Sequence, residues 1–313
     1  MKLKTYIFLI VFILIFYIYV FNINLMNIEL MNIELEEFKN QNNTIPKIIW
    51  SFWDKGKDNA PEIVKKCINN WKKLNPEWTI NILDNDNYKD FIDINEISGI
   101  DFNSLFPQKK ADLLRILLID KFGGVWLDGS TILIEPLDWI QQKISNTNKE
   151  TVLFSAHHFT TNQEKPVVEN WFIAAKPNAY FINLWKKEFI LYLKMGHKPY
   201  METFPKDIDF QKFGNSEYLT MHAGAIKIMH DSNLEKLKLF TIPASNGPFG
   251  IQTDSGWKYY KLADFLANNT NYDKYKYFIK LRGYERGILD KYLKHNNNKV
   301  SKNSILNKFL GMN

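Results

Sequence analysis

Residues 111–138, ADLLRILLIDKFGGVWLDGSTILIEPLD, constrain the fold more than any other part of the chain. Their first part predicts a helix that is apolar on almost every side, and such a helix is normally buried. Asp112 and Arg115 are three positions apart and therefore lie on one face of this helix. Burying a carboxylate and a guanidinium is costly unless each is paired or contacts a ligand. The helix is therefore expected either to contain an internal ion pair or to border a polar site.

The residues after this helix predict a turn and a short buried strand. Gly123 and Gly124 are typical of a helix C-terminus, and residues 125–127 predict a strand that ends at Asp128. Ligands of open α/β sheets bind at the carboxyl ends of strands. Asp128-Gly129-Ser130 is therefore the best candidate for chemistry, because a carboxylate in this position can bind a hard divalent cation such as Mg²⁺ or Mn²⁺. The ordinary alternative is that Asp128 is only a turn residue.

From residue 45 onward, segments with the patterns of strands and helices alternate along the chain. Strands are expected at residues 46–50, 78–83, 151–156, 171–175 and 236–242, and helices at 61–74, 179–194, 217–230 and 257–267. This alternation favours an α/β fold with a mostly parallel central sheet.

The N-terminus has the pattern of a membrane anchor. Lys2 and Lys4 precede an apolar run at residues 6–21, and its ragged continuation brings it to the roughly 20 residues that a membrane-spanning helix needs. Residues 22–43 contain no Ala, Gly or Ser, which a signal-peptide cleavage site would require. We therefore expect one uncleaved transmembrane signal anchor. The positive-inside rule favours a single-pass type II orientation, with either a Golgi-like lumenal domain or a place in a bacterial inner membrane.

The boundaries expected from these patterns divide the chain into four parts. A transmembrane signal anchor occupies residues 1–25 and a stem residues 26–44. The globular domain covers residues 45–295, and a loose, basic, Asn/Lys-rich tail covers residues 296–313.

Composition excludes several classes of protein. The net charge of +6 over 313 residues comes mostly from dispersed lysines. This balance is compatible with an anionic small ligand or anionic lipid head groups, but it is no nucleic-acid signature. Cys67 is the only cysteine, so the chain has neither an intrachain disulfide nor a cysteine metal cluster. The motifs GxxxxGK[ST], GxGxxG, HExxH and GxSxG are absent, which removes the simplest cases for an NTPase, dehydrogenase, zinc protease or serine hydrolase.

Four blocks follow one another in the sequence: IPKIIWSFWDKG, NNWKKLNPEWTINILD, ADLLR and FGGVWLDGS. This series resembles the GT-A-type glycosyltransferases of capsular polysaccharide synthesis. More distantly it is similar to the DXD-containing sugar transferases, which include yeast initiating mannosyltransferases and the glucosylating domains of large clostridial toxins. The resemblance covers residues 45–138, with weaker echoes at 168–176 and 246–257. It implies a GT-A fold and a retaining, metal-assisted transfer of a sugar from a nucleotide-sugar donor, expected to be a UDP-sugar, to a glycan or polysaccharide acceptor.

The resemblance also implies roles for individual residues. Trp53 matches the aromatic residue on which the nucleobase stacks. Asp112 and Arg115 match the pair that holds the hydroxyls of the donor sugar, and Arg115 would also support the departing diphosphate. Asp128 matches the first aspartate of the DXD motif, which contacts the sugar, the ribose and the metal-bound diphosphate. Ser130 replaces the second aspartate and is a poorer metal ligand than a carboxylate, so the Mn²⁺ or Mg²⁺ expected on Asp128 and Ser130 would be bound more weakly.

Other positions are weaker candidates. Ser255 and Trp257, in Ser255-Gly256-Trp257, resemble the mobile loop that closes over the diphosphate. Glu169 and Asn170 precede an expected strand and are candidates to face the acceptor or the reacting carbon. We expect the histidines to be structural rather than ligands, and the tryptophans other than Trp53 to belong to the core; the histidines considered are His157, His158 and His222.

Two other functions stay open at this point. The lost second aspartate suggests a catalytically silent, membrane-anchored protein that binds nucleotide sugars. A sugar-phosphate transferase would use the same donor site.

Overall fold

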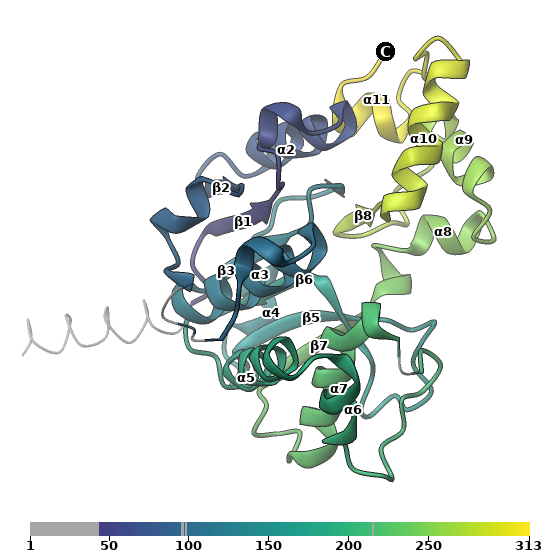
Figure 1. Cartoon of the computed structure of the whole chain (residues 1–313). Helices are drawn as coiled ribbons and strands as arrows, with labels where there is room; N and C mark the ends of the chain where they lie inside the picture. Colours follow the sequence, from purple (N-terminus) through teal and green to yellow (C-terminus); the bar gives the residue numbers. More distant parts are fainter. Residues whose placement is uncertain (1–43, 95–96, 98, 215) are drawn as a thin grey trace, which may run out of the picture. The chain divides into compact units, whose positions relative to one another are not determined.

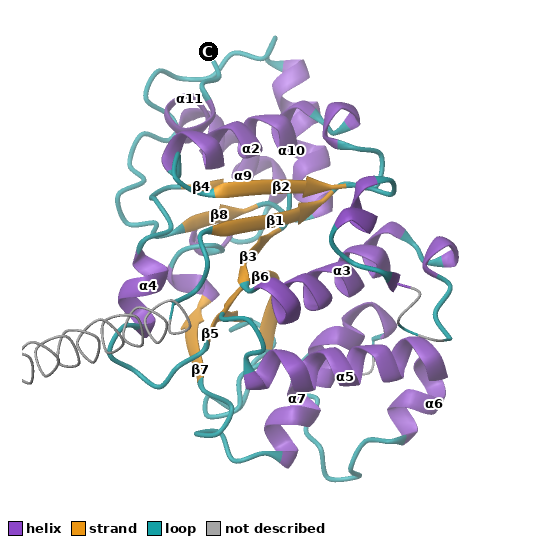
Figure 2. Ribbon diagram, turned by 90° about the vertical axis from the view of Figure 1, so that its left-hand side faces the viewer, coloured by secondary structure: helices purple, strands orange, loops and turns teal. Residues whose placement is uncertain are grey.

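A mixed six-stranded sheet runs through the centre of the unit formed by residues Ile45–Asn313, as the computed structural model of the chain shows (Figures 1 and 2). Its strands are β1 Ile48–Phe52, β2 Thr79–Leu83, β3 Gly124–Leu127, β5 Thr151–Ser155, β6 Val168–Ala175 and β7 Leu239–Pro243. Their order in the sheet is β2-β1-β3-β6-β5-β7. Only β6 is antiparallel to its neighbours, since β1 pairs in parallel with β2 and β3, and β5 with β7. The predicted α/β fold with a mostly parallel central sheet is thereby confirmed.

The structure describes residues 44–313 apart from residues 95, 96, 98 and 215. The membrane anchor predicted at residues 1–25 lies outside this part of the chain, as does the predicted stem except for Thr44. None of the helices in the described part is long and apolar enough to cross a membrane. Residues Ile45–Asn313 group into one unit, which is described by itself.

The helices surround the sheet on both faces. They are α2 Glu62–Leu74, α3 Pro107–Phe122, α4 Trp139–Ile144, α5 Tyr180–Met195, α6 His197–Glu202, α7 Thr220–Asp231, α8 Gly250–Asp254, α9 Tyr259–Asn268, α10 Gly283–His295 and α11 Ile305–Leu310. The helices predicted at residues 61–74 and 179–194 are confirmed as α2 and α5. The helix predicted at residues 217–230 begins instead as a short 3-10 turn, Glu217–Leu219, which continues into α7.

Alternate side chains of β3 enter two separate hydrophobic clusters, because neighbouring residues of a strand point to opposite faces of the sheet. Val125 and Leu127 belong to the cluster that includes α2, α4, α9, α10 and α11. Trp126 belongs to the other cluster, with α3, α5, α6 and α7. The apolar helix predicted from the sequence is α3, and it is buried between the sheet and α5.

Two glycines allow α3 to turn directly into β3. Gly123 and Gly124 have φ angles of 65° and 92°, which other residues adopt only with strain. A Cβ atom on Gly124 would lie 2.6 Å from the carbonyl oxygen of Ile48 in β1, and one on Gly123 would lie 2.7 Å from Cδ of Pro177. The Gly-Gly turn therefore sets how closely β3 approaches β1.

A second sheet joins two distant parts of the chain. Its strands are β4 Thr131–Leu133 and β8 Phe278–Lys280, which pair antiparallel with Thr131 opposite Lys280. Each strand has only three residues, too few for a recognisable alternation, and neither was predicted from the sequence. This pairing places β8 beside the residues that follow β3.

The prediction of a loose tail at residues 296–313 is wrong for its last part. Helix α11 begins after Ser304, whose side chain accepts a hydrogen bond from the Asn307 backbone. Ile305 and Leu306 are fully buried in the cluster of α2 and α9. The apolar residues of α11 thus outweigh the Asn/Lys-rich composition of the segment before it.

Candidate functional site

A cavity of about 610 Å³ lies at the carboxyl ends of the parallel strands β1 and β3. This volume is in the range of small-molecule sites. Most of the residues around it come from the loop after β1, the first half of α3, the end of β3 and the residues that follow it, strand β8 and the start of α10, while β6, the 3-10 turn Glu217–Leu219 and α7 contribute one residue each. The cavity therefore occupies the part of an open α/β sheet where ligands usually bind.

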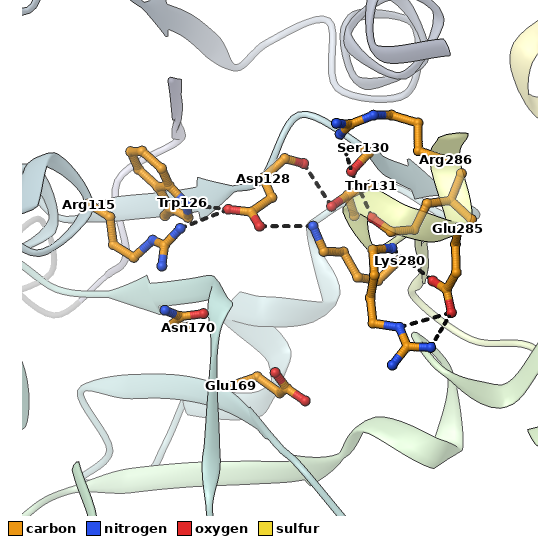
Figure 3. A network of polar contacts seen from close by, with 12 residues as sticks. Arg115, Trp126, Asp128, Ser130, Thr131, Glu169, Asn170, Lys280, Glu285 and Arg286 are labelled. Carbon is orange, nitrogen blue, oxygen red and sulfur yellow. Dashed lines mark hydrogen bonds and ion pairs between the residues drawn. The ribbon is translucent and has the colours of Figure 1, made fainter. Parts of the chain in front are cut away.

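Four charged side chains form one continuous cluster at the cavity: Asp112, Arg115, Asp128 and Lys280, called the charged cluster below. Arg115 Nη1 donates to Asp112 Oδ1 at 2.6 Å, and Nη2 donates to Asp128 Oδ1 at 2.9 Å. Lys280 Nζ donates to the other carboxylate oxygen of Asp128, also at 2.9 Å. Figure 3 shows Asp128 held between the side chains of Arg115 and Lys280. Asp112 and Arg115 therefore form the internal ion pair that was one expectation for this helix, and they also border a polar cavity, which was the other.

The two carboxylates of the charged cluster differ in their electrostatic environment. Burial raises the pKa of Asp112, and the charge of Arg115 only partly opposes this. Burial would also raise the pKa of Asp128, but Lys280 and Arg115 outweigh it and lower the pKa to about 2. Trp126 Nε1 adds a hydrogen bond of 3.1 Å to Asp128. Asp128 is therefore a fixed carboxylate at neutral pH, although 32% of its side-chain surface remains exposed.

Arg115 is held rigidly in this cluster. Its side chain is 4% exposed, and the guanidinium carbon lies 5.0 Å from the centre of the Trp126 ring, within the range of a cation–π contact. Its Nε atom is buried without a hydrogen-bond partner in the described part of the chain. The two carboxylates and the indole therefore fix the orientation of the guanidinium before any ligand binds.

Trp53 and Arg286 occupy another part of the same cavity. The guanidinium carbon of Arg286 lies 5.1 Å from the centre of the half-buried Trp53 ring. The Nη1 atom of Arg286 donates to Oγ of Ser130 at 3.5 Å. Trp53 therefore lines the cavity, with Arg286 in contact with both its ring and Ser130, and its predicted role in stacking a nucleobase stays a prediction.

The residues at the predicted metal site do not form a ligand set for a divalent cation. Both oxygens of Asp128 already accept hydrogen bonds from cations. The Ser130 hydroxyl is buried and donates to the carbonyl oxygen of Leu281 at 2.8 Å. Within residues 44–313, apart from the four that are not described, no group of three or more His, Cys, Asp or Glu side chains could hold a metal ion. The cofactor expected on Asp128 and Ser130 stays a prediction.

Two of the predicted residues lie away from the cavity. Ser255 is buried and donates to the Gln252 carbonyl oxygen at 2.9 Å. The Trp257 ring contacts the guanidinium of Arg282, whose carbon lies 4.8 Å from the ring centre, and neither Ser255 nor Trp257 lines the cavity. The structure therefore does not bring this segment to the charged cluster, and its predicted role in closing over a diphosphate stays untested.

Of the weaker candidates Glu169, Asn170 and His222, some line the cavity and others do not. Asn170 lines the cavity and donates to Asp112 Oδ1 at 3.1 Å. Glu169 is buried, and its carboxylate lies 3.8 Å from the ring of His222. Figure 3 shows Asn170 on the side of Arg115 and Glu169 farther away. Asn170 and His222 therefore line the cavity, whereas Glu169 does not.

The sequence interpretation missed Lys280 and Arg286. Both belong to KLRGYERG at residues 280–287, which has neither the spacing of a known motif nor a clear apolar period. Lys280 is 152 residues from Asp128 in sequence. The one available signal was the local concentration of cationic residues, which is as typical of a solvated surface.

By its fold this is an α/β protein with a mostly parallel central sheet, and a cavity lined by charged residues lies at the carboxyl ends of its parallel strands. The chain belongs to the capsular polysaccharide synthesis protein family, whose model matches residues 23–239. This confirms the resemblance found in the sequence. Lys280 and Arg286 lie beyond the matched residues.

Curated relatives are similar to about half of the chain. Glycosyltransferase afumC of Aspergillus fumigatus is 28% identical over 166 residues, which are 49% of this chain and 42% of that protein. O-glycosyltransferase braB of Annulohypoxylon truncatum is 29% identical over 163 residues, 47% of this chain and 37% of that protein. The chain thus matches less than half the length of these relatives.

Among solved structures, the chain is similar to one titled PaToxG Glycosyltransferase, and the superposed residues make up 83% of this chain and 92% of that chain. Its TM-score is 0.37 and its sequence identity 15%. A likeness at this level establishes no shared function.

Proposed function

We propose that this protein is a glycosyltransferase, which moves a sugar from a nucleotide-sugar donor to a glycan or polysaccharide acceptor. Membership of the capsular polysaccharide synthesis family and the names of the curated relatives support this class of reaction. The observation that carries the proposal is the placement of Arg115 between Asp112 and Asp128 at the cavity. Fixed carboxylates and a fixed guanidinium suit the recognition of hydroxyls and phosphates.

The parts of a nucleotide sugar can be assigned to parts of the cavity. Trp53 offers an aromatic face for the base, since stacking on an aromatic side chain accepts any base. Asp112 and Asp128 accept hydrogen bonds from sugar or ribose hydroxyls, and cations near them bind the diphosphate. The cationic residues that line the cavity are Lys55, Lys109, Arg115, Lys280 and Arg286, and the acidic ones are Asp54, Asp112 and Asp128. The excess of positive charge favours an anionic donor.

In the reaction, an acceptor hydroxyl attacks the anomeric carbon, and the bond from that carbon to the diphosphate oxygen breaks. The electron pair of this bond leaves with the nucleoside diphosphate, and the hydroxyl proton is lost. The chain contributes by positioning the donor and by placing positive charge where negative charge develops. A UDP-sugar donor, retention of anomeric configuration and a type II membrane anchor remain parts of this proposal.

Donor turnover by the purified full chain tests the proposal. We would incubate the protein with a panel of UDP- and GDP-sugars and measure the released sugar by chromatography and mass. Release of one sugar from one donor is expected. Asp112→Asn should abolish it because this aspartate orients Arg115 at the cavity. Asp120→Asn is the matched control, since Asp120 is a buried aspartate of the same helix, pairs with Lys186 and does not line the cavity.

The other outcomes separate the alternatives. Binding of a nucleotide sugar without turnover would indicate a silent binding protein. A product heavier by a phosphate group would indicate a sugar-phosphate transferase. Equal loss of turnover in both aspartate variants, at unchanged melting temperature, would show that the charged cluster is not the site.

A further inference from the structure

Lys280 occupies the position at the charged cluster where the sequence predicts a divalent cation. Its ammonium group contacts Asp128 Oδ2 at 2.9 Å, and its side chain is only 7% exposed. A metal ion on Asp128 would have to displace this ammonium or lie beside it, against the repulsion of like charges. The second predicted ligand is no more available, because the Ser130 hydroxyl donates to a backbone carbonyl.

The fold fixes Lys280 in this position through several contacts. Thr131 and Lys280 are directly opposite each other in the β4–β8 pair. The Leu281 amide donates to the Ser130 carbonyl oxygen at 3.0 Å, and Gln252 Nε2 donates to the Lys280 carbonyl oxygen at 2.6 Å. A buried lysine held on both sides by backbone contacts keeps its charge at one place, as a bound metal ion does.

The ammonium of Lys280 keeps unused hydrogen-bonding capacity. It has three donors, and Asp128 is its one hydrogen-bond acceptor among the described residues. Arg286 is in none of the ion pairs formed by the described residues, and its one side-chain hydrogen bond among them is the 3.5 Å contact with Ser130 Oγ. Burial lowers the pKa of Arg286, yet a guanidinium stays charged at neutral pH. Two cations with free donors therefore face the same cavity.

The charges of this region are complementary to a diphosphate. Arg115, Lys280 and Arg286 carry three positive charges against the two carboxylates of Asp112 and Asp128. The excess positive charge lies on the side of the cavity near Trp53, because Arg286 contacts the Trp53 ring. A base on Trp53 would place the adjoining phosphates next to Arg286 and Lys280.

We propose that Lys280, together with Arg286, neutralises the diphosphate of the donor, in place of a divalent cation. This inference rests on the proposed function, since it assumes a nucleotide-sugar donor. When the bond to the anomeric carbon breaks, the electron pair moves to the diphosphate oxygen, and the two fixed cations stabilise the charge there. Asp128 keeps Lys280 in position and is a positioning residue for it.

Nucleotide binding by the full chain tests this inference without relying on turnover. Calorimetric titrations would compare UDP with uridine, and GDP with guanosine, in EDTA and in Mn²⁺. One nucleoside diphosphate is expected to bind with the same Kd in both buffers. Lys280→Met should weaken its binding by about tenfold or more, the loss expected for a hydrogen bond between charged groups. Lys280→Arg should restore most of it, and binding of the nucleoside should not change.

The controls separate a phosphate contact from a damaged fold. Lys276→Met removes an exposed lysine just before β8 that does not line the cavity, and it should bind as the wild type does. Arg286→Met should repeat the effect of Lys280→Met. The melting temperature of each variant shows whether it is folded.

Three results would overturn the inference. Nucleotide binding that requires Mn²⁺ would show that a metal ion neutralises the diphosphate, while the proposed function would stand. An unchanged Kd in Lys280→Met, or an equal loss for the nucleoside, would show that this lysine does not contact phosphate. If neither nucleoside diphosphate binds in either buffer, the proposed function fails, and the inference fails with it.

Discussion

Replacement of Asp128 by asparagine should destabilise the protein by removing the shared partner of two buried cations. Arg115 and Lys280 are 4% and 7% exposed in their side chains, and removing one partner of a buried ion pair costs about 3–5 kcal/mol. Two features reduce this cost. The Asp128 side chain is 32% exposed, and Arg115 keeps Asp112. We therefore expect Asp128→Asn to lower the free energy of unfolding by about 2–3 kcal/mol.

The pH dependence of this difference follows from the pKa of Asp128. Its folded value of about 2 lies below the ordinary 3.8, so the carboxylate stabilises the folded state above pH 4 and loses this effect as the pH falls through 2. The difference between wild type and Asp128→Asn should therefore be constant from pH 5 to 7. By pH 3 it should be smaller by about 1 kcal/mol, or somewhat less because the group is partly exposed.

Urea unfolding followed by circular dichroism measures these free energies. A double-mutant cycle adds Lys280→Met, which removes the cation that Asp128→Asn leaves without its carboxylate. The double variant should lose about 1–2 kcal/mol less than the sum of the single variants, as residues in one ion-pair network do. Additive losses, together with a difference that does not change between pH 7 and pH 3, would refute the reasoning.

Three further outcomes follow from the structure. Gly124→Ala should destabilise the protein by about 2–4 kcal/mol in thermal or urea unfolding, because its Cβ would lie 2.6 Å from a backbone oxygen at a φ of 92°. Gly283→Ala, whose new Cβ would meet no atom of another part of the chain within 4 Å, is the control and should cost nothing. Cys67 is fully buried, and burial raises its pKa to about 12. A thiol reagent at pH 8 should label it only after unfolding, and rapid labelling of the native protein would contradict its placement in the core. Trp53→Ala should weaken nucleotide binding by about 1–3 kcal/mol, while Trp53→Phe should retain most of it, if bases stack on this ring; equal binding by both variants would exclude that role.

Local sequence patterns sufficed for the first half of the site. Asp112 and Arg115 are one helical turn apart, and Asp128 ends the strand that follows the Gly-Gly turn. Their positions therefore depend on a single helix and one connection, both of which leave clear periodic signals. In the structure these three residues meet at a cavity, and their roles stay predictions.

The second half of the site depends on contacts between distant segments. Lys280 approaches Asp128 only because β8 pairs with β4, and two three-residue strands have no detectable period. Arg286 follows on α10, whose apolar residues Ile288, Leu289 and Leu293 give a weak pattern among many charges. Helix α11 was not predicted because it has only six residues, Ile305–Leu310, and follows an Asn/Lys-rich segment whose composition is typical of a loose tail.

A crystal structure of the protein with its nucleoside diphosphate, grown in the presence of EDTA, would test the central claim most directly. The base is expected on Trp53, the phosphates within hydrogen-bond distance of Lys280 and Arg286, and the open end of the diphosphate directed to Arg115. A nucleotide bound elsewhere, or one turned so that its base contacts the charged cluster, would contradict the proposed donor site.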